Sequence, residues 1–263
     1  MMNSATIIPY KYGISWALKE RRNVIIVSSS SIEKPAIENS KIIYKISELV
    51  GVNVDSDNII IANLIEWDVT DQKRLVRYIN DHVGDPVVII GIIPDLDDGR
   101  SRIIDWLLHK FWICCDDEDE DVEQPHGSTV HINHSLVQYI KDLMIHMRMH
   151  RLVVQGNGGG VHTGTLKDVM LLSQCIANGL HGRDYVIPED VKQAWHWYMP
   201  WHLRVLGQDQ WDQDPSLLYG SKPQYVQQYF ATAASAAATA VRTPLARERL
   251  IAGDVLKKVV PPI

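Results

Sequence analysis

Short apolar runs rich in β-branched residues recur through the first 113 residues, with helix-like segments between them. The runs cover Asn23 to Val27, Asn58 to Ala62 and Pro86 to Gly91. Near-continuous apolar runs of this length are typical of strands buried on both faces of a parallel sheet. The intervening helices are expected over Lys41 to Val50, Thr70 to His82 and Arg100 to His109. This alternation predicts an α/β fold in which helices cover a largely parallel sheet.

The second half of the chain has a helical pattern instead. Apolar residues from Leu136 to Met147 recur at three- and four-residue spacing, which places them on one face of a helix. Further helices are expected over Thr165 to Asn178 and Pro188 to Leu206. We therefore expect an α/β core over residues 1–115, an acidic linker over 116–129 and a helical domain over 130–263.

Six consecutive acidic residues, Asp116 to Asp121, mark the boundary between the two halves. The chain has 26 basic and 32 acidic residues, so this run accounts for the whole net charge of -6. A run of like charges gains little from burial, and we expect a solvated, mobile linker. Nucleic-acid-binding domains usually carry a basic patch, so direct binding of DNA or RNA is not expected from a chain that is otherwise neutral.

The cysteines and the amino terminus indicate the cellular compartment. Three cysteines, of which Cys114 and Cys115 are adjacent, form neither a disulfide framework nor a zinc-binding pattern. No segment approaches the roughly 18 apolar residues of a membrane span, and Met1 to Tyr10 lacks the pattern of a signal peptide. We expect an intracellular protein of the cytoplasm or nucleus that does not associate with membranes.

A helix end, a turn and a new helix start follow one another from Gly179 to Lys192. Gly182 can adopt the left-handed conformation that ends a helix, and Pro188 suits the first position of the next helix. This segment resembles the lid of the MoxR branch of AAA+ ATPases. The resemblance implies an α/β nucleotide-binding core followed by a small helical lid domain.

The phosphate-binding loop of such proteins would follow the strand Val24 to Val27. Lys34 stands in the register of the lysine that contacts the terminal phosphates. The two glycine positions, however, hold Ser28 and Glu33, and Pro35 offers no hydroxyl for magnesium. The loop therefore departs from a working phosphate site at nearly every position.

The other catalytic positions of the MoxR resemblance are also altered. Asn63 and Leu64 stand where two carboxylates would hold the metal and polarise the attacking water. Ile93 replaces a polar sensor residue, and Lys110 stands where an arginine finger would be. Thr165 occupies the place of a second sensor arginine. We expect no ATPase activity, no catalytic residue and no required cofactor.

Further strings resemble the fungal maintenance of telomere capping protein 2 family across nearly the whole chain. They are Trp106 to Trp112, Gly127 to Val130, Asp142 to Leu152, Gly159 to Thr163, Trp197 to Leu203, Ser216 to Ser221 and Val255 to Pro262. The resemblance is densest from Asp105 to Gly220. It implies a fungal protein whose family name comes from a genetic link to telomere capping and not from a chemical activity.

Aromatic residues are concentrated in the helix expected from Pro188. If Val191, Ala194 and Tyr198 point inward, part of the edge formed by Trp197 and Trp201 should remain exposed. Exposed aromatic side chains of this size are typical anchors of protein interfaces. Trp197 and Trp201 are therefore our candidates for a partner-binding surface.

Two histidines, His146 and His150, stand one helical turn apart and could in principle bind a metal. No carboxylate is placed to complete the site, and Arg148 and Arg151 would repel a cation. We expect no metal site and interpret both as helix-surface histidines.

These observations together favour a non-catalytic interaction or scaffold protein with protein partners. One alternative is a nucleotide-binding protein that uses Lys34 without efficient hydrolysis. A second alternative is a nucleic-acid-binding module.

Overall fold

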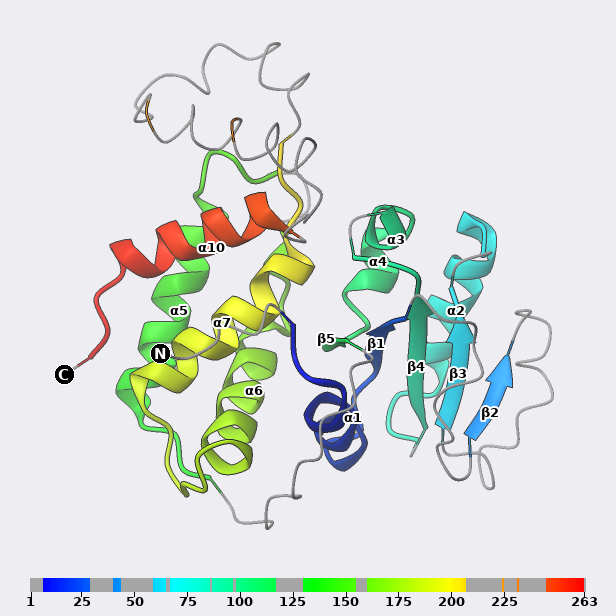
Figure 1. Ribbon diagram of the computed structural model, residues 1–263, viewed down its shortest axis with the longest axis horizontal. Helices are drawn as coiled ribbons and strands as arrows, with labels where there is room; N and C mark the ends of the chain where they lie inside the picture. Colours follow the sequence, from blue (N-terminus) through cyan, green and yellow to red (C-terminus); the bar gives the residue numbers. More distant parts are fainter. Residues whose placement is uncertain are drawn as a thin grey trace. The chain divides into compact units, whose positions relative to one another are not determined.

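A computed structural model describes residues 7–28, 40–43, 59–64, 67–85, 87–96, 98–116, 130–154, 160–206 and 245–262, together with Gln224 and Ala231. The chain divides into two compact units, Met1–Gln124 and Pro125–Ile263 (Figure 1). Lys34 and the acidic linker beyond Asp116 lie outside the described residues.

The first unit contains a five-stranded parallel sheet, as expected from the apolar runs (Figure 1). Its strands are β1 (Val24–Val27), β2 (Ser40–Ile43), β3 (Ile59–Asn63), β4 (Val88–Ile93) and β5 (Ile113–Cys115), in the order β2-β3-β4-β1-β5. β1 lies between β4 and β5, with Val24 opposite both Ile90 and Ile113. The described residues of β1, β3 and β4 are almost entirely buried, which is why their sequences are near-continuous apolar runs.

Four helices are described in this unit: α1 (Tyr10–Lys19), α2 (Val69–Asp81), α3 (Asp98–Ser101) and α4 (Asp105–Leu108). The helix expected over Thr70 to His82 is confirmed as α2. The helix expected from Lys41 is wrong at its start, because residues 40–43 pair with β3 as the edge strand β2.

The helix expected over Arg100 to His109 is interrupted between α3 and α4. The side chain of Gln72 in α2 forms hydrogen bonds with the backbone groups at this break. Its Nε2 donates to the Arg102 carbonyl at 2.9 Å, and its Oε1 accepts from the Ile104 N–H at 2.8 Å. These bonds compensate for the helical hydrogen bonds that the break removes.

The second unit consists of α5 (His134–Arg148), α6 (Thr165–Gly179), α7 (Pro188–His202) and α10 (Ala246–Lys258) among its described residues. The expected helix starts at Thr165 and Pro188 are confirmed. α7 nevertheless ends at His202 instead of Leu206, because the chain after it pairs with residues 152–154. The Val154 N–H donates to the Arg204 carbonyl at 2.9 Å, and the Leu206 N–H donates to the Leu152 carbonyl at 3.0 Å.

The corner between α6 and α7 has the predicted conformation. Gly182 has a positive φ of 59°, and the Arg183 N–H donates to the Ala177 carbonyl at 2.8 Å. The extended piece that follows forms a parallel bridge between Tyr185 and His131. Among the described residues, no helix has the length and apolar character needed to cross a membrane.

Candidate functional site

The carboxyl edge of the sheet is the first candidate site. The Ser28 N–H after β1 donates to the Ile93 carbonyl at 2.9 Å, and the Leu64 N–H after β3 donates to the Ile92 carbonyl at 3.1 Å. From β1 the chain passes to β2 at one edge of the sheet, and from β4 it passes to β5 at the opposite edge. The direction of the connections therefore reverses between β1 and β4. In open α/β sheets, ligands bind outside the carboxyl ends of the strands at such a reversal.

The side chains at this edge are mainly apolar and buried. Leu64 and Ile93 are buried, and Asn63 at the end of β3 is half-buried. A Cβ atom added at Gly91 would lie 2.8 Å from Leu64 Cδ1, so Leu64 packs directly on β4. Asp68, a nearby acid, caps α2 by accepting the Asp71 N–H at 2.8 Å. The ends of β1, β3 and β4 therefore provide the hydroxyl of Ser28, the amide of Asn63 and apolar groups, whereas a hydrolytic site uses carboxylates.

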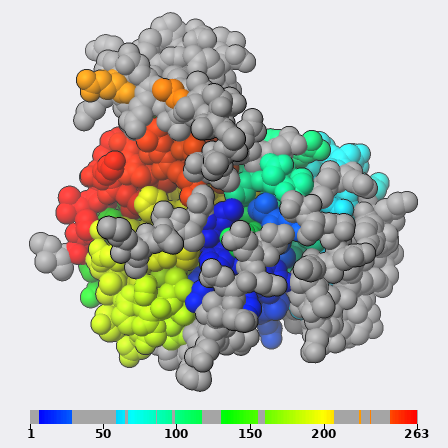
Figure 2. Space-filling model, viewed as in Figure 1, coloured from blue at the N-terminus to red at the C-terminus, as the bar shows by residue number. Residues whose placement is uncertain are grey.

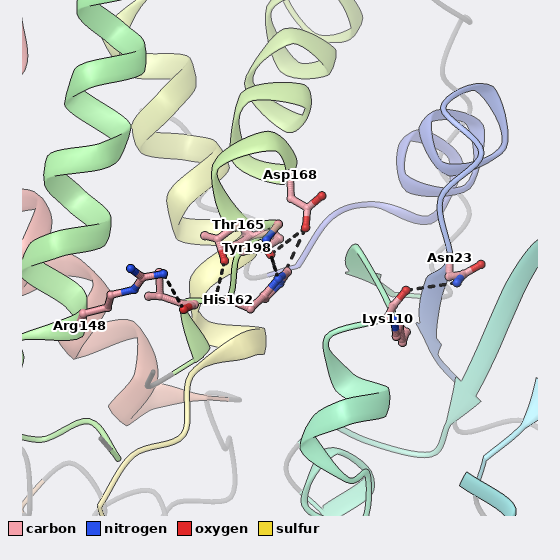
Figure 3. A network of polar contacts seen from close by, with 9 residues as sticks. Asn23, Lys110, Arg148, His162, Thr165, Asp168 and Tyr198 are labelled. Carbon is pink, nitrogen blue, oxygen red and sulfur yellow. Dashed lines mark hydrogen bonds and ion pairs between the residues drawn. The ribbon is translucent and has the colours of Figure 1, made fainter. Parts of the chain in front are cut away.

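Lys110, the position of the expected arginine finger, makes contacts within the first unit. Its Nζ donates to Asn80 Oδ1 at 2.6 Å, and its carbonyl accepts from Asn23 Nδ2 at 3.2 Å (Figure 3). Asn23 Oδ1 in turn accepts the Ile89 N–H of β4 at 2.9 Å. These bonds join the residues after α4 to the start of β1 and to β4.

Arg100, in α3 shortly after β4, is a buried arginine that was not predicted as a site residue from the sequence. Burial raises the pKa of the Cys114 thiol in β5, Asp116 raises it further, and the charge of Arg100 opposes both effects. Arg100 is therefore a buried cation close enough to β5 to act on its thiol. A single arginine among the polar residues of a short helix carries no sequence pattern that would have indicated this placement.

A buried polar network in the second unit surrounds Thr165, the first residue of α6 (Figure 3). Thr165 Oγ1 accepts the His162 N–H at 3.1 Å, and His162 Nδ1 accepts the Gly164 N–H at 3.1 Å. His162 Nε2 lies 2.9 Å from Tyr198 Oη, whose hydroxyl donates to Asp168 Oδ2 at 3.1 Å.

The geometry assigns the proton of a neutral His162. Because Nδ1 accepts a backbone N–H, the proton is on Nε2, which donates to Tyr198. The hydrogen bonds then run from His162 through Tyr198 to Asp168 and connect the start of α6 with α7. Thr165 is part of this network through its hydroxyl. His162 and Asp168 were not predicted from the sequence, since His162 and Tyr198 are 36 positions apart and form no recognisable motif.

Replacing Tyr198 with phenylalanine should lower the free energy of unfolding by about 1–3 kcal/mol, because it removes the hydroxyl that both His162 and Asp168 contact in a buried site. Urea denaturation of the full chain measures the effect. Tyr185→Phe is the matched control, since Tyr185 is exposed, and it should change stability by less than about 0.5 kcal/mol. Equal stability of the two variants would contradict the role of the network.

The aromatic helix α7 is more deeply buried than expected. Val191, Ala194 and Tyr198 point inward as predicted, but Trp201 is also buried, with 1% of its surface exposed. α7 packs against α6 and also against α10, which sequence analysis did not predict (Figure 2). The exposed edge expected for Trp201 is therefore not observed. Trp197 is half-buried, and its role at an interface remains a prediction.

The two histidines considered for metal binding have different surroundings. His146 is exposed on α5, whereas His150 lies beyond the end of that helix and is buried, contrary to expectation. His150 Nδ1 accepts the Leu152 N–H at 3.3 Å, and Nε2 lies 3.4 Å from Asp254 Oδ2 in α10. Burial and the charge of Lys258 lower the pKa of His150, while Asp254 opposes them. His150 thus helps to attach α10.

Known proteins show close similarity to this chain, although no protein-family model matches it. The maintenance of telomere capping protein 2 of Zygosaccharomyces rouxii is 37% identical over 73% of this chain and 69% of the relative. The chain belongs to the maintenance of telomere capping protein 2 family. The family member from Saccharomyces cerevisiae is 30% identical over 94% of this chain and 78% of the relative. These similarities confirm the family inferred from the sequence strings.

The fold is also similar to that of a solved structure. A crystal structure from Cytophaga hutchinsonii, described as that of "a putative ATPase", matches with a TM-score of 0.59 and 14% identity. The match covers 98% of this chain and 92% of the other. It supports the expected ATPase-like α/β fold of this telomere capping family member and says nothing about activity.

Proposed function

We propose that this telomere capping family member is a non-catalytic, AAA+-like protein of the MoxR type that acts by binding other proteins. The name of its relatives supports a role in telomere capping and hence in the nucleus. The similarity to an ATPase-like fold supports an origin in a nucleotide-binding protein. A fold does not retain its activity when the residues of the site are gone.

The observation that carries the proposal is the composition of the carboxyl edge of the sheet. Asn63 is neutral, so its amide oxygen is a weaker ligand for a metal ion than a carboxylate and cannot act as a base. Leu64 has no polar group, and its side chain packs against Gly91 of β4. ATP hydrolysis requires a bound metal ion and a positioned water molecule. An amide and a buried aliphatic side chain provide no carboxylate for the metal ion and no base for the water molecule, which supports the proposal.

We expect the purified chain to release no phosphate from magnesium ATP above the buffer blank. A phosphate-release assay at several protein concentrations tests this expectation, with Lys34→Ala as the matched variant. Release that exceeds the blank and disappears in Lys34→Ala would overturn the proposal. Release that is equal in both proteins indicates a contaminating ATPase and leaves the expected result in place.

Nucleotide binding without hydrolysis is the second candidate function. Arg100 favours it, because this buried cation follows Gly99, which packs on Ile93 at the carboxyl end of β4, the edge where open α/β sheets bind ligands. Titration with a fluorescent ATP analogue separates the two functions. Saturable binding that unlabelled ATP displaces, and that Lys34→Ala weakens, would favour this candidate over a purely structural core.

A further inference from the structure

The outward face of α5 exposes two large apolar side chains. Ile145 is 53% exposed and Met149 is 74% exposed. They stand four positions apart, at the end of α5 and at its C-cap, so they lie on the same face. The opposite face of α5 carries buried residues such as Leu136 and Leu143 and packs against α6, α7 and α10. The exposed pair is therefore not part of the core of the second unit.

Positive charge lies beside this apolar pair. Lys141 and Arg148 are seven residues apart and thus share one side of α5, and Arg151 follows the helix. Asp142, the sole acidic residue in the sequence of α5, stands three positions before Ile145, so two cations and one acid border the apolar pair. This local excess contrasts with the net charge of -6 for the whole chain. The face is therefore both basic and apolar.

One of the cations has a defined position. Arg148 Nη2 donates to the Val161 carbonyl at 3.2 Å (Figure 3), which orients the guanidinium while the residue remains exposed. Met149 beside it is a flexible side chain that adapts to the shape of a partner. An oriented cation next to an adaptable apolar group suits a partner that presents both acidic and apolar side chains.

We propose that the α5 face, formed by Lys141, Ile145, Arg148 and Met149, binds an acidic amphipathic segment of another protein. Charge complementarity selects an acidic partner, and the exposed Ile145 and Met149 select one with an apolar stripe. A nucleic-acid backbone would pair with the cations but would leave the apolar side chains uncovered. The inference rests on the proposed function, because it identifies a surface through which a scaffold protein would bind.

Fluorescence anisotropy with defined probes tests the inference on the full chain. The first probe is a labelled helical peptide with leucine along one face and glutamate along the other. The second carries lysine in place of every glutamate, and the third is a short DNA duplex. We expect the glutamate peptide to bind and the lysine peptide not to bind. The Kd of the glutamate peptide should rise about tenfold or more for the double variant Ile145→Ser/Met149→Ser and for the variant Lys141→Glu.

Val260→Ser is the control variant, because Val260 is an exposed apolar residue outside α5. It should bind the glutamate peptide like the unmodified chain, and thermal melts should show that all variants remain folded. Equal binding of both peptides, unchanged binding by the α5 variants or preferential binding of DNA would overturn the inference. Binding only after the acidic run Asp116 to Asp121 is replaced by neutral residues would also overturn it. None of these outcomes changes the phosphate-release result, so the two proposals fail independently.

Discussion

Replacing Asp190 with alanine should lower the free energy of unfolding by about 2–4 kcal/mol, because it removes the charge-assisted hydrogen bonds of a buried carboxylate and the side-chain cap at the start of α7. Asp190 is 1% exposed. Its carboxylate accepts two hydrogen bonds from Arg183, at 2.6 and 3.0 Å, and one from the Ile187 N–H at 2.9 Å. It thus joins the turn after α6 to the first turn of α7.

Urea denaturation of the full chain, followed by tryptophan fluorescence, measures this loss. Glu189→Ala is the matched control, because the neighbouring Glu189 is exposed and pairs with Lys192 at 3.2 Å on the helix surface. Surface pairs of this kind contribute about 0–1 kcal/mol. A loss in Asp190→Ala no larger than the loss in Glu189→Ala would show that the buried ion pair does not hold this corner together.

Replacing Trp201 with alanine should cost about 3–5 kcal/mol of stability, because the substitution leaves a large cavity among packed side chains. Trp201 is among the largest fully buried side chains of the described residues. The expected result is a lower melting temperature or aggregation of the chain. It would place Trp201 in the core of the helical unit and not at an interface.

Trp106→Ala provides the comparison, since Trp106 in α4 is 65% exposed. Its truncation should change the free energy of unfolding by less than about 0.5 kcal/mol. Thermal melts of both variants, together with affinity purification of bound proteins, distinguish the two interpretations of Trp201. A Trp201→Ala chain that melts normally but loses its partners would restore the interface that the sequence suggested.

Patterns within single segments were sufficient to predict much of the fold. The β-branched runs correctly predicted β1, β3 and β4, because strands that are buried on both faces need apolar side chains throughout. Gly182 and Pro188 predicted the corner between α6 and α7, because each has a backbone preference that does not depend on distant residues. The places of Asn63 and Ile93 at the ends of β3 and β4 also followed from the apolar runs, because each strand ends close to where its run ends.

Other features depended on contacts between distant segments. Residues 40–43 form strand β2 because they pair with the edge of β3. At the break between α3 and α4, the side chain of Gln72 in α2 forms hydrogen bonds with the backbone. α10 covers a face of α7 that would otherwise be exposed, and this contact helps to bury the helix that contains Trp201.

The sequence by itself determined the family, the α/β core, the helical second unit and the presence of Asn63 and Leu64 at the end of β3. These properties depend on residue identity and on short-range periodicity. Only the tertiary structure decided that His162, Asp168 and Tyr198 form one network, that Trp201 is buried, and that the exposed apolar pair lies on α5. The physical reason is that burial and hydrogen bonding are set by which surfaces meet, and residues far apart in the chain supply those surfaces.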